Sequence, residues 1–180
     1  MDKRKEANLR VKNSITQTVL RLLDKKSISE ITVSEIIREA GVARASFYRN
    51  YATKESVITT LIEDILEDYR KNMEGDGDEF YTYENVYRSF VYFERYQNQF
   101  LDLHRFGFGS ILLEMLNQFH EEVAGTMGSQ SIERYKLYIY MGALYNTALV
   151  WLQRGKKESV AEIADIFYEN CAFGVKNNEK

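Results

Sequence analysis

Proline is absent from the 180 residues, and cysteine occurs once, as Cys171. Without proline, no helix interior loses a backbone N–H or is forced to kink, so long unbroken helices are allowed. A single cysteine excludes an internal disulfide and is typical of a reduced compartment such as the cytoplasm. No apolar run reaches the roughly 18 residues that a bilayer-spanning helix needs, so no membrane segment is expected.

Other features of the chain favour a folded protein. Hydrophobic residues make up 44% of the sequence and charged residues 28%, which is enough apolar material for the core of one domain or of two small ones. The N-terminal stretch MDKRKEANLRVKNSITQ is charged and then amphipathic, without the apolar centre of a signal peptide. A cytoplasmic location is therefore expected.

The charges are distributed unevenly. Residues 1–55 carry 12 Lys/Arg against 7 Asp/Glu, a net charge of +5, whereas residues 56–180 carry a net charge of −8. A basic head on an acidic body suits a protein that presents one end to a polyanion, although solvated helix faces also cluster charge by chance. The charge alone does not decide between these; it divides the chain into residues 1–55 and 56–180, which the motifs below predict to be a DNA-binding domain and a helical regulatory and dimerisation domain.

Apolar residues recur at helical spacing along nearly the whole chain, which predicts an all-α fold. The first helix is expected over about residues 6–25, with Leu9 among its apolar positions. Thr32 and Glu35 predict a capping box at the start of an eight-residue helix. That helix is expected to end at Gly41, which adopts left-handed backbone angles without a Cβ penalty.

A short helix over 44–50 and a long helix capped by Thr53, extending to about residue 72, are expected next. The eight-residue helix, the glycine turn and the short helix together have the geometry of a helix-turn-helix. The second helix of such a motif lies in the major groove of DNA, so most of its surface must remain polar. Phe47 is the strongly apolar residue at its centre.

The other positions of the short helix are candidates for DNA contact: Arg44, Ala45, Ser46, Tyr48, Arg49 and Asn50. Arg44 can bond guanine O6 and N7, and Ser46 can bond base edges or phosphate. Lys54 adds positive charge at the start of the next helix, where free backbone N–H groups already favour a phosphate. Upstream, Lys3, Arg4 and Lys5 form either a minor-groove arm or a solubilising, frayed terminus.

The matching positions for a known family are Ile31-Thr32-Val33, Ile36, Ala40-Gly41-Val42, Ser46-Phe47-Tyr48, Tyr51 and Lys54-Glu55. With this spacing, residues 9–66 resemble the DNA-binding domain of the tetracycline-repressor (TetR) family of bacterial transcriptional regulators. The resemblance implies an all-helical homodimeric repressor that binds a palindromic operator. It also implies that Tyr48 and Lys54 contact phosphates and that Arg44, Ala45, Ser46 and Asn50 face bases; Thr32 is assigned to the same interface.

The sequence departs from the family pattern at two positions. Ala43 stands where a serine or threonine usually caps the recognition helix, which removes a side-chain cap worth about 1 kcal/mol. Asn50 stands where histidine is common, so its contact with phosphate is not implied by the family pattern.

Aromatic residues crowd the body, beginning with eight between Tyr81 and Phe100. Most of them are explained by core and interface packing. The competing interpretation is an effector cavity, for which the candidate lining residues are Tyr87, Phe90, Phe106, Phe108, Tyr138 and Tyr145. These side chains carry no concentrated charge, so the expected effector is a small apolar or aromatic molecule.

Two C-terminal helices, over about 132–154 and 158–173, resemble those that form the dimer in this family. The stretch YIYMGALYNTALVWLQRGKKES also resembles regulators allied to the dihydroxyacetone kinase activator, some of which take their signal from a partner protein. That would make the protein a regulator without a small-molecule pocket. A packed body would favour this alternative, and a cavity of several hundred Å³ would favour an effector.

Enzymatic and metal-binding functions lack support in the sequence. There is no GxSxG elbow, P-loop or dinucleotide fingerprint, and Cys171 has no nearby histidine, so no catalytic residue is assigned. His104 and His120 have no partner at metal-ligand spacing, and the EGDGDE segment lacks the spaced ligands of an EF-hand. We expect no metal and no cofactor.

Overall fold

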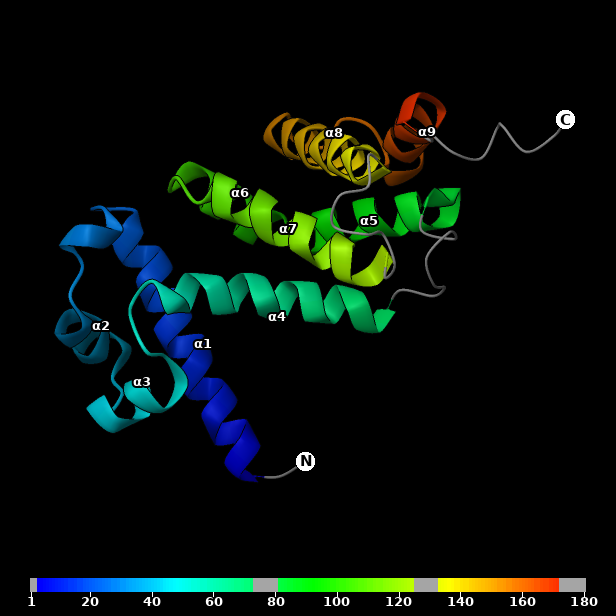
Figure 1. The fold of residues 1–180 in the computed structure, drawn as a ribbon. Helices are drawn as coiled ribbons and strands as arrows, with labels where there is room; N and C mark the ends of the chain where they lie inside the picture. The colour runs from blue at the N-terminus through cyan, green and yellow to red at the C-terminus, as the bar shows by residue number, and fades with distance from the viewer. Residues whose placement is uncertain (1–2, 73–80, 125–132, 172–180) are drawn as a thin grey trace, which may run out of the picture. The chain divides into compact units, whose positions relative to one another are not determined.

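A computed structural model describes residues 3–72, 81–124 and 133–171, and within these ranges the chain forms α-helices and short 3-10 segments, without a β-strand (Figure 1). The predicted all-α fold is confirmed. The elements are α1 (Lys3–Leu23), η1 (Ile28–Glu30), α2 (Val33–Ala40), α3 (Arg44–Asn50), α4 (Ser56–Asn72), α5 (Tyr83–Arg95), α6 (Gln97–Arg105), α7 (Gly109–Ala124), α8 (Glu133–Gln153) and α9 (Val160–Cys171).

The chain divides into two compact units, residues 1–64 and residues 65–180, which we call the N-terminal and C-terminal units. The boundary between the two ranges falls within α4 (Ser56–Asn72), whereas the sequence pattern placed the domain boundary between residues 55 and 56. The functional division between DNA-binding and regulatory parts remains a prediction. The predicted EGDGDE boundary segment lies at residues 74–79, outside the described ranges.

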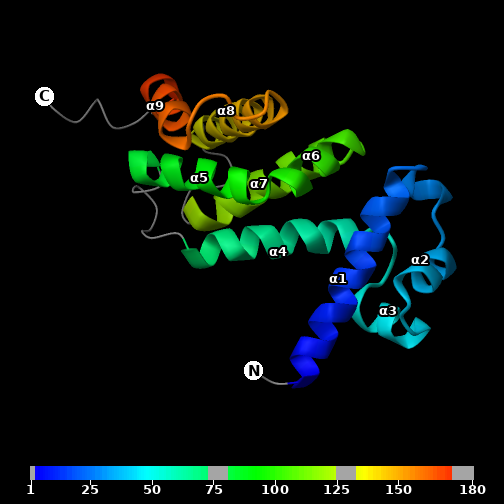
Figure 2. The same ribbon diagram turned by 180° about the vertical axis from the view of Figure 1, so that it is seen from behind.

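In the N-terminal unit, α2 and α3 lie on one side of α1 and pack against it (Figure 1 and Figure 2). Helical spacing directs one apolar stripe of each helix inward, and the fully buried core consists of Ile15, Val19, Ile31, Ile36, Phe47, Val57, Ile58 and Ile62. Leu9, one of the apolar residues at helical spacing in α1, is 53% exposed and lies outside this core. The buried positions of α1 begin at Ile15.

Helix starts in this unit follow the local sequence. The Thr53 hydroxyl accepts a hydrogen bond from the Ser56 N–H at 3.1 Å, and the Ser56 hydroxyl accepts from the Thr53 N–H at 3.2 Å. This reciprocal pair satisfies two backbone donors at the start of α4 and confirms the predicted cap. Lys3, Arg4 and Lys5 belong to the first turn of α1, not to an extended arm.

In the C-terminal unit, α5 packs on α9, and α8 contacts α5, α6, α7 and α9. Aromatic rings form much of the core. Phe90 meets Trp151 and Phe167 edge-on, with ring centroids 5.9 Å and 5.8 Å apart, and Tyr140 meets Phe167 at 5.4 Å. Such pairs contribute beyond their buried area. These aromatic residues are therefore packed core, as the first of the two interpretations expects.

The aromatic stretch from residue 81 to 100 is divided between α5 and α6, which meet at Tyr96, where the backbone leaves helical angles. Farther on, α8 and α9 lie within a few residues of the predicted ranges 132–154 and 158–173. No helix in the described ranges is long and apolar enough to span a bilayer.

Candidate nucleic-acid interface

The turn between α2 and α3 is built by a cap at one end of α2 and a glycine at the other. The Thr32 hydroxyl accepts from the Glu35 N–H at 3.2 Å, with Thr32 in extended backbone conformation. Gly41 has φ 66° and ψ 32°, in the left-handed region. A Cβ at this position would meet nothing within 4 Å, so only the backbone angles require glycine. The predicted Thr32 cap and the predicted end at Gly41 are confirmed, whereas the Glu35 carboxylate, expected to complete a capping box, bonds Lys26.

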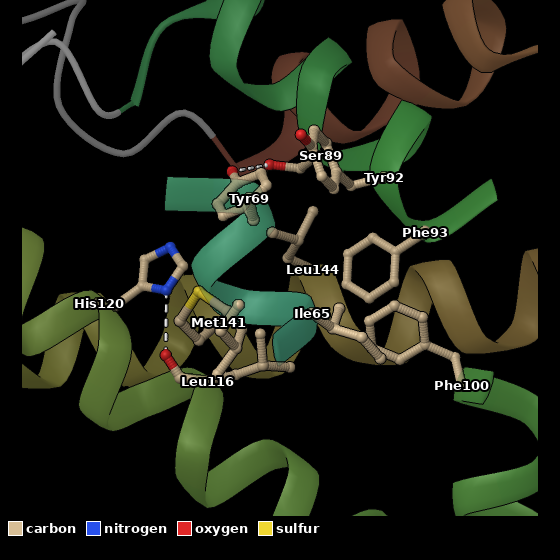
Figure 3. Close-up of a pocket in the computed structure, with 11 residues that line it drawn as sticks. Ile65, Tyr69, Ser89, Tyr92, Phe93, Phe100, Leu116, His120, Met141 and Leu144 are labelled. Atoms are coloured by element: carbon tan, nitrogen blue, oxygen red, sulfur yellow. Dashed lines mark hydrogen bonds between the residues drawn. The ribbon is translucent and has the colours of Figure 1, made fainter. Parts of the chain in front are cut away.

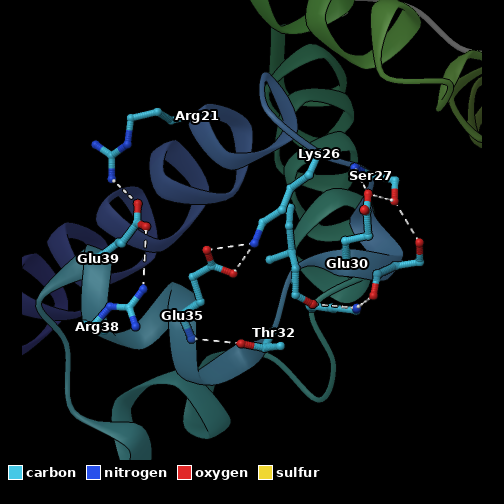
Figure 4. A network of polar contacts seen from close by, with 11 residues as sticks. Arg21, Lys26, Ser27, Glu30, Thr32, Glu35, Arg38 and Glu39 are labelled. Atoms are coloured by element: carbon cyan, nitrogen blue, oxygen red, sulfur yellow. Dashed lines mark hydrogen bonds and ion pairs between the residues drawn. The ribbon is translucent and has the colours of Figure 1, made fainter.

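A polar network holds α2 against the chain that precedes it (Figure 4). Lys26 Nζ donates to both Glu35 carboxylate oxygens, at 2.8 Å and 2.6 Å, and Arg21 lies 3.5 Å from the Glu39 carboxylate. The hydrogen bond from Lys26 lowers the pKa of Glu35, with a smaller contribution from the Thr32 backbone N–H. Ser27 donates from its N–H and its hydroxyl to the Glu30 carboxylate, at 2.9 Å and 2.7 Å.

Helix α3 buries one side chain and leaves the others exposed or half-buried. Phe47 is fully buried, whereas Arg44, Ala45, Tyr48 and Arg49 are exposed and Ser46 and Asn50 are half-buried. This distribution matches the sequence-based assignment of an inner and an outer face. The outer face is mostly polar and runs from Arg44 to Asn50, the full length of α3, with an arginine near each end. A helix that enters the major groove needs such a polar exposed face.

Contacts within α3 restrict several of these side chains. The Arg44 guanidinium lies 5.3 Å from the centre of the Tyr48 ring, and its Nη2 atom is 3.4 Å from the Tyr48 hydroxyl. Arg49 donates to the Ser46 hydroxyl at 3.2 Å. The Asn50 amide donates to the Ser46 carbonyl at 2.8 Å, which ties Asn50 to its own helix.

The N-cap of α3 is Ala43, which is extended and has no side chain able to bond the free N–H groups of the first turn. The Ala43 carbonyl still accepts from the Ser46 and Phe47 N–H groups, at 2.9 Å and 3.2 Å. The structure therefore confirms that α3 begins without a side-chain cap, as inferred from the sequence.

Lys54 has partners that the sequence did not indicate. Its ammonium donates to the Ser29 carbonyl at 3.0 Å and to the Ile31 carbonyl at 2.6 Å, and its side chain is 19% exposed. These bonds connect the segment just before α4 to the segment before α2. Two of the three ammonium N–H groups are thus used inside the protein, and at most one faces outward.

A small cavity lies inside the C-terminal unit, with a volume of about 30 Å³, enough for one or two water molecules (Figure 3). Its lining residues are mostly apolar and come from α4, α5, α6, α7 and α8: Ile65, Leu66, Tyr69, Ser89, Tyr92, Phe93, Phe100, Leu116, His120, Met141 and Leu144. The six residues predicted from the sequence to line a cavity do not belong to this set.

Those six residues occur in different surroundings. Phe90 and Phe108 are buried, and Tyr87 and Phe106 are half-buried, with the Arg105 guanidinium 4.5 Å from the Phe106 ring. The exposed Tyr138 donates to the Glu121 carboxylate, and the Tyr145 hydroxyl lies 3.5 Å from His104 Nδ1. The structure therefore does not bring the predicted set together.

The polar groups of the cavity were missed by sequence reasoning. The Tyr69 and Ser89 hydroxyls are 2.7 Å apart, and His120 Nδ1 donates to the Leu116 carbonyl at 3.0 Å. Burial lowers the pKa of His120 to about 3 and raises that of Tyr69 to about 12. Tyr69, Ser89 and His120 each lie within a helix whose apolar spacing is ordinary, so no sequence motif around them indicated a cavity.

Helices α8 and α9 expose large apolar side chains in addition to their buried ones. Tyr135 is 67% exposed and Ile139 56% exposed on α8, and Ile166 is 53% exposed on α9. Val150 adds a further exposed side chain, four turns along α8 from Tyr135. In the described part of the chain, no group of His, Cys, Asp or Glu side chains is arranged to hold a metal ion.

Comparisons with known proteins agree with this geometry. Residues 15–60 match the family model described as bacterial regulatory proteins, tetR family. The chain is 36% identical over 53 residues to the HTH-type transcriptional regulator EthR of Mycolicibacterium smegmatis, a match that covers 29% of this chain and 24% of EthR. It is 25% identical over 68 residues to the uncharacterized HTH-type transcriptional regulator YvdT of Bacillus subtilis, covering 36% of this chain and 35% of YvdT. The matches thus span about a third or less of these relatives.

The fold is similar over much more of the chain. A TetR transcriptional regulator from Streptococcus agalactiae superposes with a TM-score of 0.65 at 19% identity, covering 93% of this chain and 97% of that one. The fatty acid degradation regulator FadR from Bacillus halodurans superposes with a TM-score of 0.56 at 16% identity, covering 92% and 96%. Residues 15–60 thus match the tetR-family model, and the fold of the chain is similar to that of solved TetR transcriptional regulators.

Proposed function

We propose that the protein is a cytoplasmic, homodimeric transcriptional repressor that binds a palindromic DNA operator. The observation that carries this proposal is the polar outer face of α3, presented by a capped α2 and a left-handed glycine turn. The matched family and the similar folds are those of transcription regulators and not of enzymes.

Base recognition is assigned to the first half of α3 and to Asn50 at its end. Arg44 is exposed, and its guanidinium has the fork that bonds guanine O6 and N7. Ala45 and Ser46 are small and allow close approach to base edges. Asn50 contributes through its half-buried amide, which must reorient if it is to bond a base, because it now donates to the Ser46 carbonyl.

Phosphate contact is assigned to Tyr48, Arg49 and Thr32, whose polar atoms are at the surface of the unit. The Thr32 hydroxyl accepts from the Glu35 N–H and still has a proton to donate. Lys54 contributes at most one outward N–H, so its main role is to hold the start of α4 against the segment before α2.

Dimerisation is assigned to α8 and α9. Helix α8 has apolar side chains both in the core and on the exposed side, where Tyr135 and Ile139 stand one turn apart. A helix with apolar residues around its circumference is buried on all sides in its working state. A two-fold interface would bury this surface and present two α3 helices to half-sites about one turn, roughly 34–36 Å, apart.

The signal is assigned to a small apolar or aromatic effector that enters the cavity of the C-terminal unit. The cavity lining is largely apolar, with the Tyr69–Ser89 hydroxyl pair to orient a bound molecule. At about 30 Å³ it must expand before any effector larger than a water molecule fits. Control by a partner protein, which the resemblance to the dihydroxyacetone kinase activator subgroup suggested, is the alternative, and the packed body with a cavity far below several hundred Å³ counts in its favour.

The test of DNA recognition compares three proteins on two DNA duplexes. A duplex selected from a random-sequence library and an unselected duplex are titrated with the wild type, Arg44→Ala and Arg154→Ala. Arg44→Ala should lose about 1–3 kcal/mol on the selected duplex and lose preference at one base pair per half-site. Arg154 is exposed in the C-terminal unit, so its substitution removes the same side chain without this effect. Wild type that shows no preference between the duplexes would contradict the proposed function.

The stoichiometry and the signal need separate measurements. Sedimentation of the free protein at micromolar concentration should show a dimer, and sedimentation with the selected duplex should show one dimer per duplex. A monomer in the free protein and one monomer per duplex would refute the proposed assembly. A library of small apolar and aromatic compounds is then screened for release of the duplex. Release by a compound whose effect is lost in Leu144→Trp, which fills the cavity, supports the effector; release only by an added protein supports the alternative.

A further inference from the structure

An uncharged stripe follows the exposed side of helix α8. Positions three or four residues apart share one side of a helix, and this stripe consists of Tyr135, Ile139, Gly142, Asn146, Val150 and Gln153. Tyr135, Ile139 and Val150 are 67%, 56% and 38% exposed. At 1.5 Å per residue the stripe is about 27 Å long. An exposed apolar surface of this extent marks an interaction site.

Gly142, in the middle of the α8 stripe, has no reason within its own chain to be glycine. A Cβ at this position would meet nothing within 4 Å, and its backbone is not left-handed. Glycine is less favourable than alanine inside a helix. Its use here leaves a gap in the stripe, through which another helix can approach the backbone of α8 closely.

Asn146 is the polar residue one turn after Gly142. It is exposed, and in the part of the chain that the structure describes its amide makes no hydrogen bond. Asn170 on α9 differs, because its amide donates to the Ile166 carbonyl of its own helix at 2.7 Å. The Asn146 amide therefore has both N–H groups available for a partner. A single asparagine in an apolar helix interface fixes its register and the number of chains that assemble.

The charge of the chain favours a second copy as the occupant of the stripe. Residues 56–180 carry a net charge of −8, so two copies repel each other over much of this surface. The α8 stripe holds no charged side chain, and two copies can meet there without placing like charges in contact. A basic partner, by contrast, would gain more from the acidic surface outside the stripe.

We propose that Asn146 of each copy enters the gap over Gly142 of the other copy, and that these two identical contacts fix the register of the homodimer. The proposal rests on the dimerisation through α8 and α9 proposed above and names the residues that select the partner. A two-fold interface pairs residue i with j and j with i, so the Asn–Gly fit is used twice. The two α8 helices then run in opposite directions, with the two-fold axis between positions 142 and 146. The Asn146 N–H groups donate to a backbone carbonyl exposed beside Gly142, since a carbonyl oxygen has two lone pairs.

The first test measures the dimer Kd, by sedimentation over a dilution series, for Asn146→Ala, Gly142→Ala and Asn98→Ala. Asn98 is exposed on α6, so its variant loses the same side chain outside the stripe and should keep the wild-type Kd. Asn146→Ala loses two hydrogen bonds per dimer and should raise the Kd about 5- to 150-fold. Gly142→Ala fills both gaps and should raise the Kd at least about ten-fold. Alanine favours the helix itself, so a higher Tm with an unchanged Kd in Gly142→Ala would overturn the proposal.

The second test exchanges the two residues. Gly142→Asn alone sets two asparagines against each other, and Asn146→Gly alone leaves two gaps, so each should weaken the dimer. The double variant rebuilds the same pair with the positions exchanged and should dimerise more tightly than either single variant. Helix propensity cannot produce such a rescue, because it acts within one chain. A double variant as weak as the weaker single variant would overturn the pairing.

The outcomes separate this proposal from the proposed function. Wild type that sediments as a monomer, both free and on the selected duplex, would remove the proposed dimer itself. A wild-type dimer whose Kd is unchanged in Asn146→Ala and Gly142→Ala would overturn the Asn146–Gly142 contact and leave the dimer and its DNA binding standing. Far-UV circular-dichroism spectra equal to that of the wild type exclude unfolding as the cause of a weaker dimer.

Discussion

Lys54→Met removes an ammonium group and keeps an unbranched side chain of similar length. In the folded protein that ammonium donates to the Ser29 and Ile31 carbonyls, at 3.0 Å and 2.6 Å. Methionine cannot donate, so both carbonyl oxygens lose this partner. We expect the variant to be less stable because the bonds connect the start of α4 to the segment that precedes α2.

The size of the loss follows from the two bonds. A hydrogen bond to a charged group contributes about 1.5–3 kcal/mol. Ile31 is fully buried, so its bond is counted in full, whereas Ser29 is exposed and water can replace part of its bond. The expected loss is about 2–3 kcal/mol, which lowers the Tm of a chain of this length by roughly 4–12 °C.

The assay combines thermal unfolding, followed by circular dichroism, with DNA titration at several salt concentrations. Lys25→Met serves as the control, since Lys25 is exposed and its variant should melt with the wild type. If Lys54 acts mainly by holding the two segments, its variant melts early and its salt slope changes by much less than one per head. An unchanged Tm together with a slope lowered by about one per head would refute this reasoning and make Lys54 a phosphate contact.

Three further predictions concern stability. Burial lowers the pKa of His120 from 6.5 to about 3, so between these pH values the unfolded chain binds the extra proton and stability falls as the pH falls, by about 1.4 kcal/mol per unit. Urea unfolding at pH 7 and 5.5 should show this loss in the wild type but a smaller one in His120→Phe, and equal losses would contradict it. Gly41→Ala should destabilise by about 1–2 kcal/mol, and Gly41→Asn by less, because φ is 66° and asparagine tolerates such angles; equal Tm values for the two variants would count against this cause. Ala43→Ser should stabilise by about 0.5–1 kcal/mol through a new cap on α3, and an unchanged urea midpoint would show that no cap forms.

The sequence by itself determined the helix-turn-helix, because its signals act over a few residues. The Thr32 hydroxyl reaches the N–H three residues later, Gly41 requires only its own backbone angles, and Phe47 is the buried residue on its short helix. Each feature depends on neighbours within about one helical turn. The all-α fold follows in the same way from apolar spacing that repeats with the helical period.

Tertiary structure decided the features that depend on residues far apart in the chain. Lys54 bonds carbonyls 25 and 23 residues away. The cavity is lined by residues from five helices. Tyrosine and phenylalanine residues therefore occur in its lining, in the packed core and at the surface, although their local sequence patterns are alike. Periodicity shows that a side chain faces inward or outward, but which helix it meets there depends on packing between elements, and no local spacing encodes that choice.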